Sequence, residues 1–104
     1  MKLTPINSEL APKAAGGYSQ AVEVVGGERL LFISGQIPES TTGTVPSGFA
    51  AQARLAWSNV LAQLSAAGLS VGNLVKVTIF LSSREFAAEN RFVRQEVLGS
   101  HAPR

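Results

Sequence analysis

The chain has 104 residues, of which 45% are hydrophobic and only 15% charged, and its formal net charge is +2. A chain of this length is one domain by size, so we expect residues 1–104 to form a single domain around one core. An apolar, lightly charged surface predicts self-association. The basic residues are scattered along the chain, which argues against a nucleic-acid partner.

Composition also limits the catalytic groups that the chain can offer and the cellular location to expect. The chain contains no cysteine and one histidine, His101, which excludes thiol nucleophiles, disulfides and cysteine-ligated zinc. We therefore expect no metal and no cofactor. The first residues lack the apolar core of a signal peptide, and no segment approaches the length of a membrane span. A cytoplasmic protein without a membrane partner is the resulting expectation.

The first half of the chain predicts two strands after an extended start that contains Pro5 and Pro12. Residues 18–24 alternate in a two-residue period typical of a half-exposed strand. Residues 25–28 are turn-like and residues 29–33 form an apolar run. Such a short connection predicts that the two strands pair as an antiparallel hairpin.

The apolar run ends abruptly in Ser34 and Gly35. These residues place a hydroxyl group and an unshielded backbone N–H at the end of a strand, where ligands are commonly bound. A strand that simply runs into a turn closed by Pro38 is the alternative. The residues alone leave both interpretations open.

The middle of the chain predicts a helix followed by a strand. After the polar loop 41–46, apolar residues recur every three or four positions from Phe49, with Ser47 as the expected N-cap. Gly68 is the expected left-handed end of this helix. Residues 74–81 then alternate as a strand.

A second helix is predicted from the capping-box pair Ser82 and Glu85 to about residue 98, where Gly99 ends it. Asn90 falls in the middle of its apolar stripe. A buried amide without partners costs about 1–3 kcal/mol, so something should compensate for it. Either Asn90 is a core asparagine that bonds a loop carbonyl, or its amide serves a ligand.

The order strand, strand, helix, strand, helix predicts an α+β fold. A strand normally follows the last helix of such a unit, and residues 101–104 resemble only the approach to one. The sequence offers no catalytic triad and no glycine-rich phosphate loop. The remaining polar candidates are neutral groups, namely Tyr18, Ser34, the Gly35 N–H and Asn90.

Six segments in chain order resemble motifs of the reactive intermediate deaminases, also called the Rid or YjgF-like family. The resemblance covers the chain from about Ala11 to its end, and six motifs in the same order make chance agreement unlikely. The segments are 17–22 (Gly-Tyr-Ser-Gln-Ala-Val), 33–38 (Ile-Ser-Gly-Gln-Ile-Pro), 51–54 with 59–60, 66–69, 75–80 and 86–90.

The resemblance implies a fold similar to the small chorismate mutase trimers. Such a fold has a single mixed β-sheet with two helices packed on one face, and the homotrimer holds ligand clefts between subunits. By this comparison the chain lacks the C-terminal strand of the family.

The resemblance further implies hydrolysis of 2-imino acids or enamines to 2-keto acids and ammonia, a form of metabolite damage control. In that chemistry an arginine holds the substrate carboxylate and water adds to the imine carbon. Carried over by motif, Tyr18 lines the cleft, Ser34 and the Gly35 N–H lie at the carboxylate, and Asn90 faces the cleft from the second helix.

This chain departs from the family pattern at two places. Gly17 stands where the family has a proline, and Arg104 is the one candidate for the anchoring arginine. Counting on from Asn90 places the family arginine a few residues later, which favours Arg104 as a flanking residue. The glutamate that positions water in the family falls beyond residue 104.

The sequence therefore leaves two hypotheses for the function. One is a deaminase of the 2-iminobutanoate/2-iminopropanoate type. The other is a non-catalytic Rid-like trimer that binds a small imino or keto acid at its subunit interfaces. Endoribonuclease activity, also attached to the family name, ranks third because the net charge is only +2.

Overall fold

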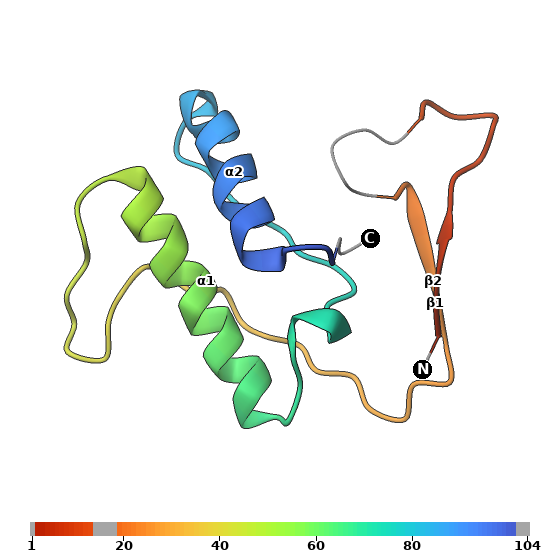
Figure 1. Cartoon of the computed structure of the whole chain (residues 1–104), viewed down its shortest axis with the longest axis horizontal. Helices are drawn as coiled ribbons and strands as arrows, with labels where there is room; N and C mark the ends of the chain where they lie inside the picture. The colour runs from red at the N-terminus through yellow and green to blue at the C-terminus, as the bar shows by residue number, and fades with distance from the viewer. Residues whose placement is uncertain (1, 14–18, 102–104) are drawn as a thin grey trace.

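The computed structural model describes residues 2–13 and 19–101 (Figure 1). A hairpin-like pair of strands lies beside a body built from two α-helices, and the α+β class predicted from the sequence is confirmed. The elements in chain order are β1 (Lys2–Ile6), β2 (Ala21–Val25), α1 (Phe49–Ala66), the 3₁₀ turns η1 (Val71–Asn73) and η2 (Arg84–Phe86), and α2 (Ala87–Leu98).

The sheet in the described residues consists of β1 and β2, which pair antiparallel from Lys2 opposite Val25 to Ile6 opposite Ala21. This differs from the predicted hairpin, in which β2 would pair with residues 29–33. Gly26 has a φ of +78° directly after β2, and the chain then runs across to the helices instead of folding back (Figure 1). The N-terminal segment, expected only to be extended, supplies the partner strand.

Residues 29–33 and 74–81 are extended but form no strand ladder within the described part of the chain. Ile33 and Val77 pack against the core, and Leu74 belongs to it. The predicted strand 29–33 is therefore wrong, and its apolar run is largely exposed, with Leu30 72% and Phe32 87% exposed. The helices contact these segments and each other rather than a continuous sheet.

The core lies between α1 and α2. Each helix presents one apolar stripe to the other, as the sequence period predicts. Phe49 at the start of α1 also stacks on Phe86 of η2, with ring centroids 4.8 Å apart. The buried residues of the core are Trp57, Leu64, Leu74, Val93 and Leu98.

The ends of the helices agree with the sequence more closely at their C-termini than at their N-termini. Gly68 and Gly99 follow α1 and α2 with φ values of +74° and +59°, as predicted. Gly48 rather than Ser47 precedes α1, without a side-chain capping bond. Before the second helix, Ser83 rather than Ser82 caps η2, where its hydroxyl accepts a hydrogen bond from the Glu85 N–H at 3.3 Å. The N-cap of α2 itself is Phe86, which makes no side-chain capping bond.

Within the described ranges, neither α1 nor α2 combines the length and the apolar content that crossing a membrane requires.

Candidate functional site

The structure describes three of the five predicted site residues. Ser34 and Gly35 lie in the exposed extended segment that follows Ile33, and Asn90 lies half-buried in the first half of α2. Tyr18 and Arg104 fall outside the described residues. The geometry of the candidate site is therefore built on the segment around Gly35 and on α2.

Gly35 is open to an approaching ligand. A Cβ atom added at this glycine would meet no atom within 4 Å. No hydrogen bond to its backbone N–H is found among residues 2–13 and 19–101, so the N–H is an available donor. Exposed backbone donors of this kind suit a carboxylate, which accepts several hydrogen bonds.

Contacts on both sides hold the Ser34–Gly35 segment. Upstream, Ile33 packs against the core of the two helices. Across Gly35, the Gln36 side-chain Nε2 donates to the Ser34 carbonyl oxygen at 3.0 Å. These contacts fix one end of the segment and span its most flexible residue.

Downstream, the segment is tied to α1 by Asn59. Its Nδ2 donates to the carbonyl oxygen of Ile37 at 2.8 Å and to that of Glu39 at 3.1 Å. The sequence analysis treated Asn59 only as part of a motif and missed this role. The available signal was an asparagine inside an amphipathic helix, because asparagine is unfavourable in a helix interior and its amide needs a polar partner or solvent.

Asn90 presents an amide without a protein partner in the described part of the chain. It lies one turn before Val93, which is 1% exposed, yet its own polar atoms are not sealed from solvent. If Asn90 were a core asparagine, its amide would bond a loop carbonyl. Within the described residues it makes no such bond. No hydrogen bond links Asn90 directly to Ser34 or Gly35 in this region either.

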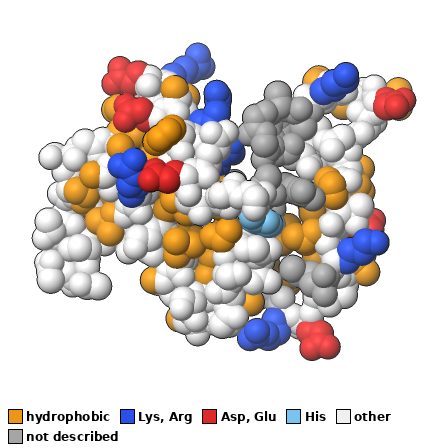
Figure 2. Space-filling model, in the orientation of Figure 1, with side chains coloured by type: hydrophobic (Ala, Val, Ile, Leu, Met, Phe, Trp, Pro, Cys, Tyr) orange, Lys and Arg blue, Asp and Glu red, His pale blue; other side chains and the backbone are white. Residues whose placement is uncertain are grey.

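Charge is distributed without a dominant patch on the face seen in Figure 2, where basic and acidic side chains are interspersed. One ion pair joins the two helices, with Arg54 Nη2 3.1 Å from Glu96 Oε2. Among the described residues no cluster of three or more metal-ligating side chains occurs.

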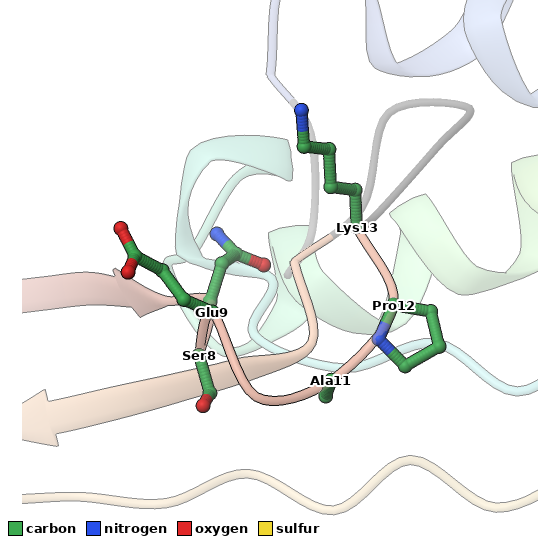
Figure 3. A pocket seen from close by; sticks show the side chains of 6 residues that line it. Ser8, Glu9, Ala11, Pro12 and Lys13 are labelled. Atoms are coloured by element: carbon green, nitrogen blue, oxygen red, sulfur yellow. The ribbon is translucent and has the colours of Figure 1, made fainter.

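A surface hollow of about 660 Å³ lies elsewhere, on the loop after β1 (Figure 3). All of its lining residues are exposed, and Ser34, Gly35 and Asn90 are not among them. Among the described residues, this hollow therefore shares no lining with the candidate site. Its lining residues are Asn7, Ser8, Glu9, Ala11, Pro12 and Lys13.

Comparison with known proteins places the chain in a family. The family model described as Endoribonuclease L-PSP matches residues 8–104. The 2-iminobutanoate/2-iminopropanoate deaminase of Escherichia coli is 45% identical over 87 residues, which is 82% of this chain and 66% of that protein. The chain belongs to the reactive intermediate deaminase family. TdcF of E. coli is 41% identical over 92 residues, covering 86% of this chain and 69% of TdcF.

Solved structures of the family share the fold. The crystal structure of E. coli TdcF with bound serine superposes with a TM-score of 0.68 at 37% identity, covering 94% of this chain and 76% of that one. Yeast Mmf1 gives a TM-score of 0.69 at 33% identity, covering 98% and 80%. The chain spans about two thirds of the length of the curated family members it matches.

Proposed function

We propose that this member of the family hydrolyses small 2-imino acids of the 2-iminobutanoate and 2-iminopropanoate class. The observation that carries the proposal is the open backbone at Gly35, whose N–H has no hydrogen-bond partner among the described residues and whose Cβ position is free of other atoms within 4 Å. The name of the 45% identical E. coli relative supplies the substrate class.

In the proposed reaction the Ser34 hydroxyl and the Gly35 N–H hold the substrate carboxylate. Water adds to the imine carbon and the nitrogen takes up a proton. The resulting carbinolamine then expels ammonia and leaves the 2-keto acid. Tyr18 is proposed to line the cleft and Asn90 to orient the reacting groups with its amide. An arginine is the proposed bidentate partner of the carboxylate; Arg104 is the one candidate for it in this sequence, although the spacing from Asn90 favours Arg104 as the residue that flanks the anchor.

A homotrimer with sites at the subunit interfaces is part of the same proposal, as is the cytoplasmic location expected from the sequence. Its support is the amount of apolar side chain that the subunit leaves uncovered, including Leu30, Phe32 and Phe80, which are 72%, 87% and 93% exposed. Sedimentation equilibrium should give three times the 10.9 kDa subunit mass. A monodisperse monomer at micromolar concentration would contradict the trimer.

The competing functions are less well supported. The names of the E. coli relatives favour hydrolysis over ligand binding alone. The description of the family model names an endoribonuclease, but a net charge of +2 and interspersed charges suit a small acid better than an RNA backbone.

Alanine oxidised by an amino-acid oxidase yields 2-iminopropanoate, and trapping by semicarbazide reports how long the imine survives. We expect the protein to shorten that lifetime, Ser34→Ala to slow the reaction, and the exposed helix variant Ser58→Ala to leave it unchanged. An imine lifetime equal to that in buffer, with 2-oxobutanoate still bound, would favour the non-catalytic alternative. Cleavage of RNA without imine loss would favour the nuclease.

A further inference from the structure

Asn59 makes an unusual pair of contacts from the middle of α1. One nitrogen atom, Nδ2, donates to two backbone carbonyl oxygens, at 2.8 Å to Ile37 and 3.1 Å to Glu39. A primary amide has two hydrogens on this nitrogen, so each carbonyl can receive its own. Both distances lie in the normal range for N–H···O bonds.

These two carbonyl groups flank Pro38, where the chain turns. The Glu39 N–H also donates to the Ile37 carbonyl oxygen at 2.8 Å, which closes a tight turn around the proline. Asn59 therefore does not merely touch the loop. It fixes both sides of the turn that terminates the Ser34–Gly35 segment.

The segment has few other restraints. Residues 30–36 make no backbone hydrogen bonds to other described backbone groups, and Gly35 has the greatest intrinsic freedom of any residue type. Within the described chain, the Gln36 bond to Ser34 and the packing of Ile33 restrain its upstream part. The downstream part depends on Asn59.

We propose that Asn59 is a positioning residue, which sets the direction of the Gly35 N–H and the Ser34 hydroxyl by holding the turn at Pro38. The identity of the ligand they receive, a 2-imino or 2-keto acid, rests on the proposed function. The position requires two donors, so an aspartate of the same shape would direct negative charge at two carbonyl oxygens. It would release the turn without removing side-chain volume.

The matched control is Gln52, also in α1, whose Nε2 donates to the carbonyl oxygen of Pro46 at 2.9 Å. Gln52→Ala removes a helix-to-loop bond of the same kind, but from the far end of the same loop. Comparing it with Asn59→Asp and Asn59→Ala separates a specific effect on the site from a general loss of loop anchoring.

Two readouts test the proposal. In ¹H–¹⁵N spectra without ligand, Asn59→Asp should shift the amide signals of Ser34 and Gly35, and Gln52→Ala should not. In imine hydrolysis, Asn59→Asp and Asn59→Ala should raise KM by about tenfold, with a smaller change in kcat. This factor is expected when a misaligned Ser34–Gly35 segment loses one to two hydrogen bonds to the substrate. A variant that is only partly folded would instead lose kcat at constant KM.

Unchanged Ser34 and Gly35 signals in Asn59→Asp would overturn the positioning role, as would equal shifts in Gln52→Ala. If wild-type protein neither hydrolyses the imine nor binds 2-oxobutanoate, the proposed function fails, and the ligand-free spectra still decide the role of Asn59. A lower melting temperature with unaltered KM and unaltered Gly35 signal would make Asn59 a structural residue only.

Discussion

The Nε2 atom of His101 lies 3.1 Å from the carbonyl oxygen of Leu74. This contact joins the segment that follows α2 to the segment that follows η1. Leu74 is 8% exposed and begins the extended segment 74–81, whereas His101 follows the left-handed turn at Gly99. The His101 N–H also donates to the Leu98 carbonyl oxygen at 3.1 Å. The histidine, the only one in the chain, thus closes α2 onto a segment that has no ladder partner in the described residues.

His101→Ala should lower the free energy of unfolding by about 1 kcal/mol, the usual value of one hydrogen bond between a side chain and a partly buried carbonyl. Urea unfolding followed by Trp57 fluorescence is the measurement. Ser100→Ala, a change at the exposed neighbour, is the control and should have no effect. An unchanged midpoint in His101→Ala would show that water replaces the bond at no cost.

Gly35→Ala should separate stability from binding. The added methyl group meets no atom within 4 Å, and Gly35 does not have a positive φ, so we expect stability to stay the same or rise by about 0.4–1 kcal/mol. The same methyl group projects into the open space beside the Gly35 N–H. Affinity for 2-oxobutanoate, measured by calorimetry, should therefore fall by about tenfold, equivalent to one lost hydrogen bond.

Gly72→Ala is the matched control for this glycine, because its added Cβ would meet only the Ser70 hydroxyl at 3.8 Å. It should leave affinity unchanged. Equal loss of affinity in both variants would remove Gly35 from the site.

The ion pair between Arg54 and Glu96 should contribute little. Both the Nε and Nη2 atoms of Arg54 approach the same carboxylate oxygen, at 3.2 and 3.1 Å, but the two side chains are 48% and 49% exposed. A double-mutant cycle with Arg54→Ala and Glu96→Ala should give a coupling energy of about 0.2–1 kcal/mol that declines with added salt. A coupling well above this range would indicate that the pair is shielded from water in the assembled protein.

Leu64→Ala should be severely destabilising because Leu64 is 3% exposed in the core between the helices. The lost contacts and the cavity should together cost about 2–5 kcal/mol. Leu10→Ala is the control, since Leu10 is 99% exposed, and it should change stability by less than about 0.5 kcal/mol. Chemical denaturation of the two variants should rank them far apart, and similar midpoints would contradict the assignment of the core.

Local signals in the sequence determined the helices and pointed to the segment that is proposed to bind the ligand. The apolar period of α1 and α2 is set by residues three and four apart, and the glycines that end both helices adopt the left-handed conformation that the sequence predicts. Ser34 and Gly35 were recognised because their types change abruptly after an apolar run. None of these inferences requires knowledge of distant residues.

The tertiary structure alone decided which segments meet. β2 pairs with β1 rather than with residues 29–33, although both neighbours are extended and the sequence period does not distinguish them. The bonds of Asn59 join residues 20 and 22 positions apart, and that of His101 reaches 27 positions back to Leu74. Such contacts depend on how whole helices pack against extended segments of the chain. The local pattern of residue types does not determine that packing, so these contacts could not be predicted from it.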